Sequence, residues 1–273
     1  MSILKRLIGQ AKPSSPKPAS PEKTQAKSAK ALNMDEVLAK EWSQTTPPER
    51  AALAEHFKDS AYPHSFDWNW KKINYNRMAL VTYVTARIPD CAYLEIGCDQ
   101  NALFDAVSAL DKTGVDPGRG GTIRKTSDDF FADNEKKFDF IWVDGLHEYS
   151  QVHRDVANSI AALKPGGFIA LHDLLPTNWK IEHMPRMNLG WTGDVWKVAM
   201  EIAATKGLDF KLVTVDHGCG IFRVMDGAEP LADLSGTIAH EKFGYLYENS
   251  GKLPLATWEE TKVWVDEVLD TRP

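Results

Sequence analysis

Cysteine is scarce in this 273-residue sequence, which contains only Cys91, Cys98 and Cys219. The number is odd and no two of them form a CxxC pair, so neither a disulfide framework nor a thiolate zinc site is indicated. A reducing compartment fits this composition, and we expect a cytoplasmic location.

Long apolar runs are also missing. No run approaches the roughly 20 residues that a membrane-spanning helix needs. The amino terminus lacks the apolar segment and the small-residue cleavage site of a secretory signal peptide. We therefore expect neither a secreted nor a membrane-spanning protein.

Outside the first 30 residues, acidic side chains outnumber basic ones. The first 30 residues hold seven Lys or Arg against Glu22 alone, a balance of +6, so the formal net charge of −6 leaves −12 on the rest of the chain. An acidic protein lacks the cations that bind phosphates, which argues against nucleic acid as a partner.

Residues 1–32 are expected to form a disordered basic tether. From residue 10 to residue 30 the segment is rich in Pro, Ser, Lys and Ala and has no large apolar side chain, so it cannot offset the entropy of its own ordering. Residues 1–10 place apolar side chains at helical spacing beside two cations. This pattern fits a frayed terminus, or weak docking to a membrane surface or a protein.

Residues 33–90 are expected to form a helical amino-terminal lid. Thr46 and Glu49 have the spacing of a capping box, with Pro47 at the first helical position. A further helix over residues 73–88 should stop before Pro89. The tail, residues 226–273, is expected to be a helical carboxy-terminal extension.

Residues 91–225 alternate short apolar runs with amphipathic stretches, which is typical of βαβ units. We predict an α/β fold with a doubly wound, Rossmann-like, seven-stranded sheet. Residues 138–143 and 167–171 are almost continuously apolar, as strands covered on both faces are. The expected strands are 92–96, 113–116, 122–125, 138–143, 167–172, 210–215 and 219–224.

The first motif runs from the expected strand 92–96 into a turn and contains Glu95-x-Gly97. In such sheets ligands bind beyond the carboxyl ends of the strands, where a glycine permits close approach of the backbone. A dinucleotide-binding GxGxxG counted from Gly97 would need glycines where Asp99 and Ala102 stand. A nicotinamide oxidoreductase is therefore disfavoured.

Two further carboxylates follow the next strands. Asp116, 19 positions after Gly97, can accept hydrogen bonds from ribose hydroxyls, or it can form a turn before Pro117. Asp128 can face an adenine amino group, or it can cap a short helix.

The most informative segments are Asp144-Gly145-Leu146-His147 and His172-Asp173, at the ends of two expected strands. Neighbouring parallel strands lie about 4.8 Å apart, so these side chains should converge at one edge of the sheet. Carboxylates and imidazoles that converge in this way suit a divalent cation. Alternatively, His147 only caps the following helix and His172 packs beneath it.

Taken in order, these motifs and the Lys164-Pro165-Gly166-Gly167 turn resemble those of class I S-adenosylmethionine-dependent methyltransferases, over roughly residues 92–224. The resemblance implies a last strand that is antiparallel, S-adenosylmethionine as the cofactor, Asp116 on its ribose and Asp128 near its adenine. Asp99 stands where the family more often has glycine. The cofactor-binding residues implied are Glu95, Gly97, Asp99, Asp116, Asp128 and Asp144.

The DGxH and HD segments are similar to those of metal-dependent small-molecule and sugar O-methyltransferases. That resemblance implies that Asp144 and Asp173 hold magnesium, and that His147 is the general base, with Asp144 beside it in the catalytic site. His172 departs from the pattern, because those enzymes place an acidic residue there. We count His172 as a third candidate metal ligand, which leaves open magnesium, a softer divalent metal, or none.

The expected function is therefore transfer of a methyl group to a hydroxyl of a glycan or other small molecule. Two alternatives remain: a metal-independent N- or carboxyl-methyltransferase, and a non-catalytic cofactor-binding scaffold. Trp179 and Trp191 can stack on a sugar ring or can be ordinary packing residues.

Overall fold

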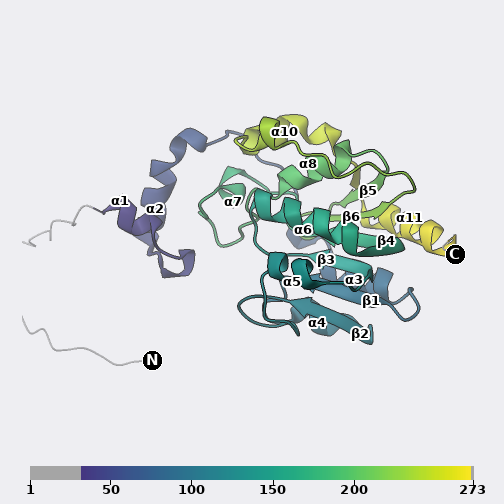
Figure 1. Ribbon diagram of the computed structural model, residues 1–273. Helices are drawn as coiled ribbons and strands as arrows, with labels where there is room; N and C mark the ends of the chain where they lie inside the picture. The colour runs from purple at the N-terminus through teal and green to yellow at the C-terminus, as the bar shows by residue number, and fades with distance from the viewer. Residues whose placement is uncertain (1–31, 272–273) are drawn as a thin grey trace, which may run out of the picture. The chain divides into compact units, whose positions relative to one another are not determined.

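The computed structural model describes residues 32–271, shown as a ribbon in Figure 1. The expected tether and docking segment lie outside the described residues, apart from Leu32. Residues 33–271 belong to one compact unit, which contains the sheet and the helices described below.

The core is a seven-stranded sheet with the strand order β2-β1-β3-β4-β6-β5-β7. Neighbouring strands pair in parallel, except that β6 runs antiparallel between β4 and β5. The predicted doubly wound fold with an antiparallel strand is confirmed. The strands are β1 (Ala92–Ile96), β2 (Asp111–Val115), β3 (Phe138–Val143), β4 (Leu163–Leu171), β5 (Leu208–Val213), β6 (Cys219–Val224) and β7 (Leu255–Ala256).

One of the seven predicted strands was wrong. Residues 122–125 form only an isolated bridge between Ile123 and Val115. The preceding turn folds back on β2 so closely that a Cβ on Gly114 would lie 2.8 Å from the Cα of Gly121. The seventh strand is instead β7, in the tail that was expected to be mostly helical.

Helices cover both faces of the sheet, as the alternation of side chains along β3 requires. Ile141 and Val143 belong to one hydrophobic cluster, which includes side chains of α6 and α8. Phe140 and Trp142 belong to a second cluster, which includes side chains of α3 and α11. The central helices are α3 (Arg77–Thr85), α4 (Ala102–Ala106), α5 (Ser127–Asp133), α6 (Tyr149–Ala162), α7 (Trp179–Glu182), α8 (Trp196–Ala204) and α11 (Trp258–Asp270).

The segments on either side of the core are largely helical. The capping box predicted at Thr46 and Glu49 is present at the start of α2, where the Glu49 carboxylate accepts the Thr46 backbone N–H at 2.7 Å. No helix within residues 32–271 is long and apolar enough to cross a membrane. The remaining helices are α1 (Met34–Leu38), α2 (Pro47–His56), α9 (Ser235–Ile238) and α10 (Phe243–Asn249).

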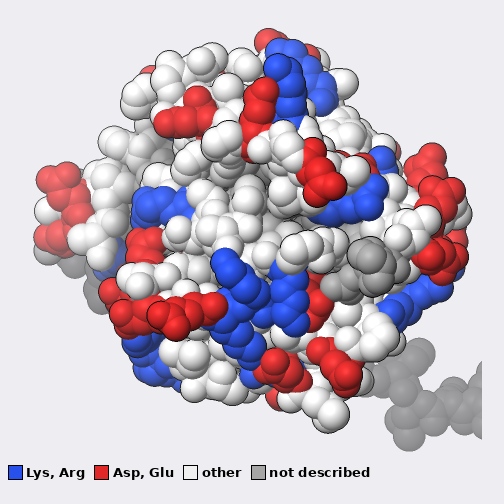
Figure 2. Space-filling view, turned by 45° about the vertical axis from the view of Figure 1, so that its right-hand side comes forward, with Lys and Arg blue, Asp and Glu red and all other residues white. Residues whose placement is uncertain are grey.

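Charged side chains of both signs lie beside one another on the face shown in Figure 2. The ion pairs among residues 32–271 include exposed ones, such as Lys58 with Glu55 at 2.6 Å. Such pairs contribute little to stability, because water screens them. This face has no continuous band of one sign.

Candidate functional site

A cavity of about 980 Å³ lies beyond the carboxyl ends of β1, β2, β3 and β4, the place where parallel α/β sheets bind ligands. The structure brings all but one of the predicted site residues to its wall. The predicted residues that line the cavity are Glu95, Gly97, Asp99, Asp116, Asp144, His147, His172 and Asp173.

Asp128 is the predicted site residue that does not line the cavity. Its carboxylate pairs with Arg154 at 3.2 Å and accepts a hydrogen bond from the Gln151 side chain at 3.2 Å. The Arg154 hydrogen bond lowers the pKa of Asp128. Its neighbours Thr126 and Ser127 line the cavity instead.

Gly97 is required by the packing of the backbone. Its φ is +86°, and a Cβ built there would lie 2.1 Å from the carbonyl oxygen of Asp144. The loop after β1 therefore presses against the loop after β3, which no larger residue permits. This contact fixes Asp144 at the rim of the cavity.

Asp116 holds the turn that follows β2. Its carboxylate accepts backbone N–H groups of Gly118 at 2.8 Å, Arg119 at 2.9 Å and Asp99 at 3.0 Å. Burial raises its pKa, but these hydrogen bonds outweigh burial and lower the pKa overall. The predicted turn-forming role is therefore present, and the ionised carboxylate also lines the cavity.

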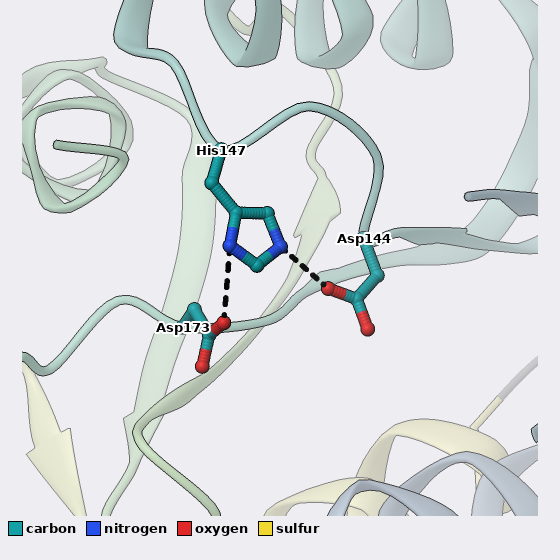
Figure 3. Close-up of side chains that lie close together, drawn as sticks. All are labelled: Asp144, His147 and Asp173. Atoms are coloured by element: carbon teal, nitrogen blue, oxygen red, sulfur yellow. Dashed lines mark hydrogen bonds and ion pairs between the residues drawn. The ribbon is translucent and has the colours of Figure 1, made fainter. Parts of the chain in front are cut away.

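Asp144, His147 and Asp173 meet at the edge of the sheet (Figure 3). Asp144 follows β3, His147 lies in the loop that leads to α6, and Asp173 follows β4. The Nε2 atom of His147 is 3.3 Å from Asp144 Oδ1, and its Nδ1 atom is 3.4 Å from Asp173 Oδ2. The predicted convergence of these three side chains is thus present in the fold. One potential ligand atom of each lies within 4.8 Å of the others.

His172 lies beneath this group. Its Nδ1 atom is 3.4 Å from Asp144 Oδ1 and 3.3 Å from Asp173 Oδ1. Burial lowers the pKa of His172, but the two carboxylates outweigh burial and raise it well above its ordinary value. The group of Asp144, His147 and Asp173 does not include His172.

Two residues of the site were missed by sequence reasoning. Asp216, in the turn between β5 and β6, lies 3.6 Å from His172 Nε2 and 2.8 Å from the guanidinium of Arg77. Arg77, the first residue of α3, also reaches within 4.0 Å of Asp144. Asp216 has a φ of +43°, a left-handed backbone conformation that Asp adopts more readily than most residues. An Asp directly after an expected strand was therefore the local signal for this turn.

Residues 191–194 pack against His147 and the residues that follow it. The Trp191 ring stacks on the His147 ring with 5.5 Å between centroids, and its carbonyl oxygen is 3.3 Å from His147 Nδ1. Asp194 accepts the backbone N–H of Tyr149 at 2.7 Å. Gly193 approaches so closely that a Cβ would lie 1.8 Å from the His147 carbonyl oxygen. Trp191 therefore packs on the candidate base, and Trp179 packs edge-on against His183.

Glu95 is a buried carboxyl on β1 that also lines the cavity. The hydroxyl of Tyr93 donates a hydrogen bond to it. Burial raises the pKa of Glu95 to about 7, against the opposing effect of the Tyr93 hydrogen bond. This carboxyl therefore changes its charge near neutral pH.

Comparison with known protein families gives one match. Residues 51–174 match the model of a protein family described as a methyltransferase domain. The matched segment covers less than half of the 273-residue chain. No curated protein matches the chain.

Similar solved structures are distant in sequence. The SAH-bound methyltransferase PaMTH1 of Podospora anserina is 15% identical, with coverage of 67% of this chain and 97% of that chain and a TM-score of 0.42. A protein from Corynebacterium glutamicum is 13% identical, with coverage of 67% and 93% and a TM-score of 0.40. MycE methyltransferase from the mycinamycin biosynthetic pathway, in complex with Mg and SAH, is 17% identical, with coverage of 66% and 57% and a TM-score of 0.38.

Proposed function

We propose that this protein transfers the methyl group of S-adenosylmethionine to a hydroxyl of a sugar or other small molecule, with His147 as the general base. The observation that carries the proposal is the meeting of Asp144, His147 and Asp173 on the wall of the same cavity that Gly97 and Asp116 line. Such a transfer requires a base within hydrogen-bonding reach of the acceptor hydroxyl, in the cavity that binds the cofactor.

The cofactor is proposed to occupy the part of the cavity beside β1 and β2. There Gly97 lines the cavity, and the ionised Asp116 can accept hydrogen bonds from ribose hydroxyls. Glu95, Asp99 and Asp144 line the same space, while Asp128 would need to leave Arg154 to reach the adenine.

His147 can move a proton at a defined atom. When the neutral ring carries its proton on Nδ1, this N–H donates to the Trp191 carbonyl oxygen at 3.3 Å and Nε2 is the acceptor. Once Nε2 has taken the hydroxyl proton, it can donate to Asp144 Oδ1 at 3.3 Å. Asp144 and Asp173 thus stabilise the imidazolium from both sides, which favours proton transfer as the methyl group arrives.

The side chains also fit a divalent cation. Carboxylate oxygens of Asp144 and Asp173 lie within 4.8 Å of each other and of a His147 nitrogen. The Nδ1 atom of His172 also lies 3.4 Å from Asp144 Oδ1 and 3.3 Å from Asp173 Oδ1. Divalent metals use such oxygen and nitrogen donors. We propose Asp144 and Asp173 as ligands, with His172 as the nitrogen ligand, because this leaves His147 free as the base. When bound, the cation would lower the pKa of an acceptor hydroxyl.

The proposal is tested by measuring SAH formation with a panel of monosaccharides, uronic acids and nucleotide-linked sugars. Wild-type protein should form SAH, and His147→Ala should bind S-adenosylmethionine but lose turnover. Activity that survives a chelator would favour the metal-independent N- or carboxyl-methyltransferase. Indifference to His147→Ala would favour the non-catalytic scaffold.

A further inference from the structure

Arg186 presents a guanidinium group to the cavity on the side of His147. It lies in the loop between α7 and α8 and lines the cavity together with Leu146 and His147. Its guanidinium carbon is 5.6 Å from the centre of the Trp191 ring, and that ring stacks on His147. Arg186 and the candidate base therefore both contact the Trp191 ring.

The guanidinium is held in place by the backbone alone. Nε donates to the Asn188 carbonyl oxygen at 2.9 Å, and Nη2 donates to the Leu189 carbonyl oxygen. Nη1 has no hydrogen-bond acceptor among residues 32–271. These two hydrogen bonds fix the Arg186 side chain, and they leave Nη1 available as a donor.

Arg186 also lacks a carboxylate partner within the described part of the chain. The two other guanidiniums that line the cavity are neutralised, Arg77 by Asp216 and Arg119 by Asp99. Burial alone lowers the pKa of Arg186, and no neighbouring carboxylate raises it. A partly buried cation without a counter-charge is costly, so an anionic ligand on this wall would be stabilised.

We propose that Arg186 binds an anionic group on the acceptor, so that the natural acceptors are acidic sugars or other small molecules that carry a carboxylate or a phosphate near the methylated hydroxyl. This inference rests on the proposed function, because it concerns the acceptor of that reaction. Hydrogen bonds from a guanidinium to a carboxylate or phosphate are stronger than those between neutral groups, and Nη1 of Arg186 has two N–H groups available for them.

The test is calorimetric binding to the SAH-loaded protein, with glucose, glucuronate and glucose 1-phosphate as probes. Glucuronate or glucose 1-phosphate should bind about tenfold more tightly than glucose, and the preferred anion identifies the source of the charge. Arg186→Gln should remove that advantage, and Arg186→Lys should restore part of it. The matched control is Lys180→Gln, which removes one exposed positive charge outside the cavity wall and should leave binding of all three probes unchanged.

Three results would overturn the inference: glucose binding as tightly as both anions, no binding of either anion, or an anion preference that Arg186→Gln retains. A loss of SAH affinity in Arg186→Gln, without a change in probe binding, would assign the residue to the cofactor carboxylate instead. Methylation of neutral sugars by the wild-type protein would contradict this inference alone, whereas absence of any methyl transfer would contradict the proposed function.

Discussion

The Nδ1 atom of His147 lies 3.4 Å from Oδ2 of Asp173, and this contact joins the loop after β3 to the turn after β4. Burial lowers the pKa of His147, but hydrogen bonding to Asp144 and the charge of Asp173 outweigh it and raise the pKa overall. The same contacts that orient the ring therefore also favour its protonated form, as a general base requires after proton transfer.

Gly97→Ala should destabilise the fold and abolish cofactor binding. The new Cβ would lie 2.1 Å from the Asp144 carbonyl oxygen, so the loops after β1 and β3 would have to separate. We expect a loss of about 2 kcal/mol or more in the free energy of unfolding, measured by chemical denaturation. Gly227→Ala is the matched control, because Gly227 has φ +75° and nothing within 4 Å of its Cβ position. Equal losses in the two variants would contradict the packing role of Gly97.

Asp194→Ala should lower kcat by about tenfold or more while leaving the affinity for S-adenosylmethionine within about twofold, because it frees the loop that carries His147. Asp194 accepts the Tyr149 N–H at 2.7 Å and pairs with the buried Lys197 at 2.8 Å. Asp194→Asn keeps an oxygen acceptor for Tyr149 and should retain more activity than Asp194→Ala. A kcat as high as that of the wild type in Asp194→Ala would show that the segment does not position the base.

Glu95 should make stability fall as pH rises through neutrality. Its pKa is raised to about 7 in the fold, from 4.5, so its favourable contribution is complete below pH 4.5 and is lost as pH rises through about 7. The Glu95→Gln side chain cannot ionise. The free energy of unfolding of this variant, relative to that of the wild type, should therefore increase between pH 5 and pH 8. Denaturant titrations at several pH values measure this difference. Parallel pH profiles for the two proteins would rule out a protonated Glu95.

Asp173→Asn should weaken divalent-cation binding and methyl transfer together. The variant keeps the size of the side chain but removes a charge that faces His147 and His172. Calorimetry with Mg²⁺ and Mn²⁺, followed by turnover before and after chelator treatment, measures both effects. If the wild type binds neither cation and resists the chelator, the metal part of the proposal fails while the role of His147 still stands.

Much of the fold was predictable because its cues are local. Continuous apolar runs identified β3 and β4, and Asp144 and Asp173 could be paired because they end neighbouring strands. The strand expected at residues 122–125 was wrong, because a glycine-rich turn packs against β2 and leaves only one bridge. The sequence pattern could not reveal that packing.

The polar surroundings of the site were less predictable. Arg77, Arg186 and Asp216 come from a helix start, a loop and a hairpin turn that are far apart in the sequence. The pairing of Arg77 with Asp216 depends on the tertiary fold, so the sequence pattern does not reveal it. The same holds for the lack of a carboxylate partner for Arg186 among residues 32–271. Conversely, Asp128 follows the expected order of motifs, yet its side chain pairs with Arg154 on α6 and does not line the cavity.

The most direct test of the account is the rate of SAH formation by His147→Asn under saturating S-adenosylmethionine, compared with the wild type. The account predicts unchanged cofactor affinity and a rate lower by about 10²- to 10⁴-fold, the usual contribution of a general base. A variant that turns over as fast as the wild type, or a wild-type protein that binds no S-adenosylmethionine, would contradict it.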